Sequence, residues 1–203
     1  AKSIDESLRK LETDYIDLLL IHQAFGDYYG TYRAMQKALE AGKVRAIGLS
    51  NFVDARFVDL VENMEVKPAV LQLETHVFSQ QKHMRGLMAP YGTRLMAWAP
   101  LAEGRNGIFT HPTLTAIGAK YGKTAAQTAL RFLMAEDVIA IPKSVHRERL
   151  VENFSIDDFE LSAEDLDAIR ALDGGKPMFA DFNDPTLAKF LLEYDAKFNP
   201  ERQ

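Results

Sequence analysis

Polar side chains that could do chemistry follow directly after apolar runs in this sequence. The run "YIDLLLIHQ" ends on His22 and Gln23, the run "VRAIGLSNF" leads into Ser50 and Asn51, and the run "VLQLE" contains Gln72. A histidine can hydrogen-bond or transfer a proton near neutral pH, while amide and hydroxyl groups suit a ligand that offers both donors and acceptors. The pattern predicts a binding site assembled from the ends of several strands.

A second polar group is the cationic stretch "PKSVHRER", which contains Lys143, Ser144 and Arg149. The whole chain is acidic, with 24 lysines and arginines against 29 aspartates and glutamates and a net charge of -5. This balance argues against a nucleic-acid or anionic-membrane surface, so any anion site must be local. Because the stretch lies between an apolar run and a helical pattern, it is typical of a phosphate site at a helix start.

Other kinds of site are disfavoured by the composition. The absence of cysteine excludes a disulfide framework and a thiolate nucleophile or ligand. The histidines other than His22 lack a recognisable ligand spacing, so we predict no metal site. The apolar runs are far shorter than the roughly 18 residues of a membrane span, and the N-terminus lacks a signal-peptide core. We therefore expect a cytoplasmic protein without membrane contact.

The elements that must position these side chains alternate between short apolar runs and amphipathic helical patterns. Strands are predicted at residues 15–22, 44–49, 70–74, 95–99 and 138–141. Helices are predicted from a capping box at Ser3 and Glu6, at residues 32–41, 55–63, 81–91 and 111–121, from a second capping box at Thr124 and Gln127, and at residues 147–154 and 163–172. Buried strands alternating with helices indicate an α/β fold with a parallel sheet covered on both faces.

Two α/β architectures compete, and the sequence favours the (β/α)8 TIM barrel. A doubly wound dinucleotide-binding sheet usually has G-x-G-x-x-G after its first strand, and neither that motif nor a P-loop occurs here. In a barrel the active site gathers at the carboxyl ends of the strands, where the polar residues are found. A complete barrel has eight strands, so we expect a single domain over residues 1–203 that is a partial barrel of about five strands, lacks upstream βα units and ends in a loop and tail from residue 174.

Five stretches carry a family resemblance: "YIDLLLIHQ", "GKVRAIGLSNF", "PAVLQLETHVF", "LMAWAPLAEG" and "IPKSVHRERLVENF". In this order and spacing they resemble the aldo-keto reductases, which are NADPH-dependent carbonyl reductases built on a TIM barrel. The resemblance runs from about Ser3 to Asp173. It implies reduction of an aldehyde or ketone to an alcohol by hydride transfer, with NADP(H) as the cofactor and a small carbonyl compound as the substrate.

The resemblance also implies roles for individual residues. His22 matches the catalytic histidine that hydrogen-bonds the substrate carbonyl. Ser50, Asn51 and Gln72 match the residues that hold the nicotinamide carboxamide. Trp98 matches the aromatic residue that stacks on the nicotinamide, where most members have tyrosine.

The adenosine end of the cofactor is implied to lie near the last motifs. Its residues by resemblance are Leu101, Lys143, Ser144, Arg149, Glu152 and Asn153. A lysine point charge and a planar arginine suit the 2′-phosphate of NADP, so we expect a preference for NADPH over NADH. In the tail, Phe179 and Phe182 are candidates for the border of the substrate mouth.

One departure from the family pattern concerns the general acid. The family uses a tyrosine with a lysine and an aspartate behind it, and these belong to upstream strands. None of the tyrosines of this chain lies in the matching motif, so we expect this polypeptide alone to be inactive. The alternatives are a non-catalytic module that binds nicotinamide nucleotides and an unrelated TIM barrel whose Lys143 and Arg149 bind a substrate phosphate. The oligomeric state stays open.

Each candidate residue also has a plain structural interpretation. His22 could be a core histidine, Ser50 and Asn51 could cap the next helix, and Trp98 could belong to the core. Lys143 and Arg149 could form an ordinary solvated face, and Glu74 could be a carboxylate of a buried network.

Overall fold

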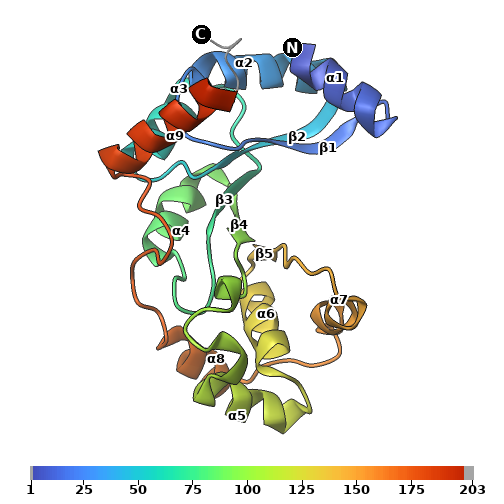
Figure 1. Ribbon diagram of the computed structural model, residues 1–203, viewed down its shortest axis with the longest axis vertical. Helices are drawn as coiled ribbons and strands as arrows, with labels where there is room; N and C mark the ends of the chain where they lie inside the picture. The colour runs from blue at the N-terminus through green and yellow to red at the C-terminus, as the bar shows by residue number, and fades with distance from the viewer. Residues whose placement is uncertain (1, 199–203) are drawn as a thin grey trace. The chain divides into compact units, whose positions relative to one another are not determined.

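The fold consists of parallel strands that alternate with helices, in a computed structural model that describes residues 2–198 (Figure 1). The strands are β1 (Ile16–Ile21), β2 (Val44–Ser50), β3 (Val70–Glu74), β4 (Arg94–Trp98) and β5 (Ile139–Ala140). They form one five-stranded sheet in the order β1-β2-β3-β4-β5. The predicted α/β class with about five parallel strands is confirmed.

Helices follow every strand of this sheet. The α-helices are α1 (Lys2–Leu11), α2 (Tyr28–Glu40), α3 (Ala55–Asn63), α4 (Lys82–Met88), α5 (Pro112–Tyr121), α6 (Ala125–Ala135), α7 (Arg147–Phe154), α8 (Ala163–Arg170) and α9 (Pro185–Phe198). Short 3-10 helices are η1 (Ala89–Tyr91), η2 (Ala102–Gly104) and η3 (Ile108–Thr110). No helix in the described part of the chain is both long and apolar enough to cross a membrane.

The chain divides into two compact units, which we describe separately. The first unit contains the chain up to Gln72, residues 86–93 and the residues from Ala180 onward, and the second contains residues 73–85 and 94–179. The expectation of a single domain over residues 1–203 stays a prediction.

In the first unit, β1 and β2 pair in parallel from Ile16 opposite Val44, and β2 pairs with the first half of β3. Apolar runs suit these strands because both faces are covered. Gly48 in β2 has no room for a side chain, since a Cβ there would lie 2.6 Å from Cδ2 of Leu20 and 2.8 Å from the carbonyl oxygen of Val70. Figure 1 shows α2 and α3 lying on the same side of β1 and β2.

In the second unit, β4 and β5 pair in parallel, with Met96 opposite Ile139. Helix α6 follows a complete capping box, in which Oγ1 of Thr124 accepts the N–H of Gln127 and the Gln127 side chain accepts the N–H of Thr124. The capping box that the sequence predicted at Thr124 is therefore confirmed. Every α6 residue from Ala125 to Leu130 is buried, so this cap also fixes the direction of a core helix.

Two predicted helix starts differ from the structure. Helix α2 begins at Tyr28 rather than Tyr32, because the Asp27 side chain accepts the N–H of Gly30 at 2.7 Å and supplies an earlier cap. The predicted capping box at Ser3 is wrong, since Ser3 lies inside α1 and its carbonyl accepts the Ser7 hydroxyl. A Ser-x-x-Glu pattern one residue inside a helix looks the same in the sequence as a true cap.

The predicted tail contains a helix that the sequence analysis did not assign, α9. The segment before it is tied to α3 within the first unit. Nη1 of Arg56 donates to the carbonyl of Phe182 at 3.0 Å, and Nδ2 of Asn183 donates to the Asp54 carboxylate at 2.6 Å. The Arg56 guanidinium also lies over the ring of Phe25, 5.0 Å from its centroid. The tail is thus attached by specific polar contacts and is not only a loop.

Candidate active site

Three of the predicted site residues lie at the carboxyl ends of β1 and β2 in the first unit, and a fourth, Gln72, lies in the middle of β3. His22 directly follows β1, Ser50 is the last residue of β2, and Asn51 comes next. Ser50 is paired in register with Gln72 of β3, and the N–H of Asn51 donates to the carbonyl of Gln72 at 2.9 Å. Parallel pairing therefore brings the strand ends together, as the sequence predicted.

Asn51 connects the first two strand ends through its side chain. Its Nδ2 lies 3.5 Å from the carbonyl oxygen of His22 and 3.5 Å from Oε1 of Gln23, which are long hydrogen bonds. Its backbone has a φ of 62°, in the left-handed region that asparagine tolerates better than most residues. This turn takes the chain out of β2 while keeping Asn51 buried at the strand end.

Ser50 has a polar atom that the protein leaves unsatisfied. The residue is 1% exposed, and its Oγ has no hydrogen-bond partner among the described residues. Buried hydroxyls are normally paired, because an unpaired one loses its hydration without compensation. An orphaned hydroxyl on a residue that precedes Asn51 and pairs in register with Gln72 fits a ligand group with its own donor and acceptor, such as a carboxamide.

The structure excludes two of the plain interpretations in this unit. His22 is exposed, so the core-histidine alternative is wrong. The N-cap residue of α3 is Asp54, so Ser50 and Asn51 do not cap that helix. Neither His22 nor Ser50 therefore has the structural role that its plain interpretation gave it.

In the second unit, Trp98 ends β4 and is only partly buried. Its ring lies 5.7 Å from the ring of Phe179, with an interplanar angle of 53°. Trp98 is therefore not fully enclosed in the core, and its role at the cofactor stays a prediction. A partly exposed indole at a strand end can offer a flat face to a ligand.

The remaining predicted cofactor residues line one pocket of the second unit, with a volume of about 570 Å³. Those residues are Leu101, Lys143, Ser144, Arg149, Glu152 and Asn153. They come from the segment after β4, the segment after β5 and helix α7. All six were named from the sequence alone, and the structure places them around one cavity.

The pocket is lined by two positive side chains and by one acidic side chain that is already hydrogen-bonded. Lys143 and Arg149 are exposed, and neither forms an ion pair within residues 2–198. Glu152 already accepts the hydroxyl of Thr124 at 2.6 Å, which keeps it on the α6 side. The Ser144 hydroxyl accepts the N–H of His146 at 3.1 Å and shapes the turn before α7. Two uncommitted cations beside a helix start can hold a phosphate.

The same pocket contains residues that the sequence analysis did not assign to it. The most notable are Phe109, which is 53% exposed, and Thr124, which the sequence marked only as a helix cap. Phe109 belongs to η3, and nothing in its stretch "NGIFTHP" distinguishes it from a core aromatic. The exposure of Phe109, which indicates that its ring can contact a ligand, is visible only in the structure.

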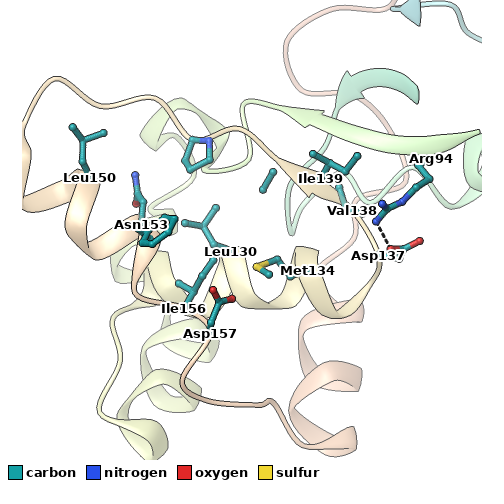
Figure 2. A pocket seen from close by; sticks show the side chains of 13 residues that line it. Arg94, Leu130, Met134, Asp137, Val138, Ile139, Leu150, Asn153, Ile156 and Asp157 are labelled. Atoms are coloured by element: carbon teal, nitrogen blue, oxygen red, sulfur yellow. Dashed lines mark hydrogen bonds and ion pairs between the residues drawn. The ribbon is translucent and has the colours of Figure 1, made fainter. Parts of the chain in front are cut away.

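A second cavity of about 530 Å³ lies beside β5 and shares Asn153 with the first (Figure 2). Figure 2 shows Leu130 and Met134 of α6 facing Ile139 of β5 across this space. At one end Nη2 of Arg94 donates to Oδ1 of Asp137 at 2.5 Å, so this charged pair is already matched. The lining is mainly apolar and gives less polar recognition than the first pocket.

Three of the tyrosines are unsuited to act as a general acid near neutral pH. A hydrogen bond to Asp59 raises the pKa of Tyr29 to about 12, burial raises the pKa of Tyr32, and a hydrogen bond to Glu62 raises the pKa of Tyr91. A catalytic tyrosine needs the opposite shift, toward neutral pH. These shifts agree with the sequence analysis, which assigned no tyrosine to this role.

Glu74 is a buried-network carboxylate, as its plain interpretation predicted. It is 3% exposed, and it accepts hydrogen bonds from His76 and from the backbone N–H groups of Met178 and Phe179. Burial raises the pKa of this carboxyl, but the bonds from His76 and the two N–H groups outweigh burial and hold the pKa below its ordinary value. Glu74 is therefore ionised at neutral pH.

Comparison with known proteins identifies the family of this chain. Residues 1–174 match the profile of the Aldo/keto reductase family. Glyoxal reductase of Bacillus subtilis (strain 168) is 42% identical over 171 residues, which are 84% of this chain and 61% of that protein, so the chain spans less than two thirds of this relative.

Two solved structures share the fold. The aldo-keto reductase MGS-M4 from a Medee basin deep-sea metagenome library has a TM-score of 0.86 and 38% identity, and the match covers 90% of this chain and 68% of that one. A point mutant of Gox0644 in complex with NADPH has a TM-score of 0.85 and 33% identity, with the same coverage of 90% and 68%.

Proposed function

The chain belongs to the aldo-keto reductase family, and we propose that it carries the carbonyl-orienting and NADP(H)-holding parts of a reductase that converts an aldehyde or ketone to an alcohol. The observation that supports this most is the single pocket lined by the six residues of the proposed adenosine end. When bound, NADPH supplies the hydride. The similarity to a glyoxal reductase suggests a small dicarbonyl compound as the substrate class.

His22 is the residue that we place at the substrate carbonyl. It is exposed at the end of β1, and its main-chain carbonyl is held by Asn51. A ring N–H at this position stabilises the charge that develops on the carbonyl oxygen during reduction. His22 thus acts as a hydrogen-bond donor that orients the substrate.

Ser50, Asn51 and Gln72 are proposed to hold the nicotinamide carboxamide, and Trp98 to support the ring face. The unpartnered Oγ of Ser50 fits this role, because the carboxamide provides both a donor and an acceptor. Holding the carboxamide fixes which face of the ring points toward the carbonyl.

Lys143 and Arg149 are proposed to bind the 2′-phosphate, with Leu101, Ser144, Glu152 and Asn153 completing the adenosine end. Both cations lack an ion-pair partner in the described residues, so a phosphate would not have to displace a carboxylate from them. This arrangement favours NADPH over NADH.

We further propose that this chain alone does not turn over carbonyls. None of its tyrosines lies in the general-acid motif, and three of them have raised pKa values. The same observation favours a second candidate function, a non-catalytic module that binds nicotinamide nucleotides.

One experiment separates these two functions. The protein is isolated from its source, its mass and N-terminal sequence are determined, and NADPH oxidation is followed after glyoxal is added. A reductase consumes NADPH. In the protein as isolated from its source, His22→Gln should lower kcat by about 10²- to 10⁴-fold while the Kd for NADPH is unchanged. Bound NADPH that is never consumed supports the module, and unchanged turnover in His22→Gln removes His22 from the mechanism.

A further inference from the structure

The segment after α8 is held at two separate points within the second unit, one by the connection between β3 and α4 and one by Glu74, the last residue of β3. At the first point the N–H of Gly174 donates to the carbonyl of Phe78 at 2.9 Å, and the N–H of Gln80 donates to Asp173 at 3.1 Å. At the second point, Glu74 binds the segment with its side chain. Exposed residues lie between the two points.

The second point depends on a single carboxylate. The N–H of Met178 donates to Oε1 of Glu74 at 2.5 Å, and the N–H of Phe179 donates to Oε2 at 3.0 Å. Each oxygen of Glu74 therefore accepts one backbone N–H. Among the side chains, only a carboxylate has two acceptor oxygens that can do this. Buried hydrogen bonds to a charged group are stronger than neutral ones.

His76 holds this carboxylate in place. Its Nδ1 accepts the N–H of Phe78 at 3.2 Å, so the ring proton lies on Nε2, which is 3.2 Å from Oε1 of Glu74. The imidazole N–H thus donates to Oε1, the same oxygen that accepts the N–H of Met178. Glu74 and His76 are 3% and 0% exposed, so water does not compete for these bonds.

The result of this anchoring is the position of the Phe179 ring. The ring lies 5.7 Å from the Trp98 ring and 6.1 Å from the His76 ring, between centroids. The Arg105 guanidinium lies on the ring as well, 4.8 Å from its centroid. The backbone N–H that Glu74 binds belongs to the same residue whose ring packs against Trp98.

We propose that Glu74 is a positioning residue that holds Phe179 against Trp98 and so builds one wall of the carbonyl substrate's site. The place of this wall beside the substrate rests on the proposed function, in which Trp98 supports the nicotinamide. Glu74 itself touches neither substrate nor cofactor. It determines which carbonyl compounds fit by fixing the aromatic side chain opposite the indole.

The test compares Glu74→Gln with the unaltered chain by amide hydrogen exchange and by acrylamide quenching of Trp98, the only tryptophan. A glutamine keeps the shape but has one acceptor oxygen, so one backbone N–H loses its partner. Exchange at Met178 and Phe179 should accelerate about tenfold or more, while exchange at Gly174 stays unchanged. Glu160→Gln, which removes a 90% exposed carboxylate, is the matched control and should change neither signal.

Phe179→Ala is the second variant, and it should raise the accessibility of Trp98 as much as Glu74→Gln does. The double variant should show no further increase, because both changes remove the same ring contact. Unchanged exchange in a folded Glu74→Gln, or unchanged quenching in Phe179→Ala, would overturn the proposal. If Glu74→Gln does not fold, Met178→Pro removes one donor and leaves the carboxylate, and it must produce the same rise in quenching.

A titration with NADPH separates this proposal from the proposed function. If calorimetry shows that NADPH binds to the unaltered chain but the Trp98 emission does not change, the assignment of Trp98 to the nicotinamide is wrong. The exchange and quenching results do not need the cofactor, so they decide the role of Glu74 by themselves.

Discussion

At the scale of single residues, replacing Ser50 tests whether its hydroxyl binds a ligand or supports the fold. Its Oγ is buried and unpartnered among the described residues, so removing it should not destabilise the protein. We expect Ser50→Ala to leave the free energy of unfolding unchanged or to raise it by up to about 1 kcal/mol, and to weaken NADPH binding. Urea denaturation and a fluorescence titration measure the two effects.

Ser162 is the matched control for this prediction, because its hydroxyl caps α8 by accepting the N–H of Asp165 at 3.2 Å. Ser162→Ala should lower the free energy of unfolding by about 1 kcal/mol and leave NADPH affinity unchanged. A loss of stability in Ser50→Ala as large as that in Ser162→Ala would show that Ser50 is structural.

The types of the site residues were predictable from the sequence, but their contacts were not. A polar residue after an apolar strand is visible as a pattern, which is why His22, Asn51 and Gln72 could be named. The unpartnered state of Ser50 and the exposure of Phe109 depend on neighbours that are distant in the sequence. Glu74 could be named as a buried carboxylate, but its bonds to residues about a hundred positions later could not be foreseen.

At the scale of elements, the start of α6 joins helix stability to the pocket. Thr124 caps the helix through the N–H of Gln127 and also donates to Glu152. Thr124→Ala should lower the free energy of unfolding by about 0.5 to 2 kcal/mol, as the loss of an N-cap does. Thermal or urea denaturation checks this value. Thr115→Ala, at an exposed position inside α5, is the control, and an equal loss there would exclude the cap as the cause.

Two glycines should respond to alanine in opposite directions. In β2 a Cβ on Gly48 would lie 2.8 Å from the carbonyl oxygen of Val70, so Gly48→Ala should destabilise the protein by about 1 to 3 kcal/mol. In α4 a Cβ on Gly86 would meet no atom within 4 Å, so Gly86→Ala should stabilise the protein by about 0.5 to 1 kcal/mol. Urea denaturation of both variants provides the measurement, and a stable Gly48→Ala would contradict the close packing of these strands.

Elements with strong local signals were predicted well, and those defined by tertiary contacts were not. Helices α3 and α7 and strand β3 have the predicted ends, because apolar periodicity and local charge mark them. Strand β5 is shorter than predicted, since its pairing with β4 covers only Ile139 and Ala140. Helix α9 was missed because its sequence had been assigned to a tail by resemblance, although it has helical periodicity of its own.

At the scale of the whole molecule, the partly buried carboxylate of Glu136 makes stability depend on pH. Burial would raise the pKa of Glu136, but hydrogen bonds from Arg170 and Arg85 outweigh it and hold the pKa below the ordinary value of 4.5. A folded-state pKa below the unfolded one stabilises the protein fully above 4.5, and this contribution is lost as the pH falls through the folded-state pKa. Urea denaturation between pH 6 and pH 3 should therefore show falling stability.

Glu136→Gln should flatten this pH dependence, since the variant has no proton to gain at that site. Glu160→Gln removes an exposed carboxylate with only a distant arginine contact and should leave the slope as it was. An equal slope in the unaltered chain and in Glu136→Gln would contradict the role of this carboxylate.

The fold class and family were recognisable from the sequence because five motifs in order carry more information than any one of them. The alternation of buried runs with helices predicted parallel pairing, and the register of β1, β2 and β3 follows it. The substrate was not predictable, because it depends on connecting segments that vary independently of the strands.

The central claim is that the residues of this chain hold NADP(H) through a 2′-phosphate site in the pocket of Lys143 and Arg149. Titration of the chain with NADPH and with NADH, followed by Trp98 emission and by calorimetry, tests it directly. Replacing both cations by alanine should weaken NADPH binding by about 1 to 3 kcal/mol and change NADH binding little, whereas Lys189→Ala on α9 should affect neither. Equal losses for both cofactors, or no binding of either to the unaltered chain, would contradict the account.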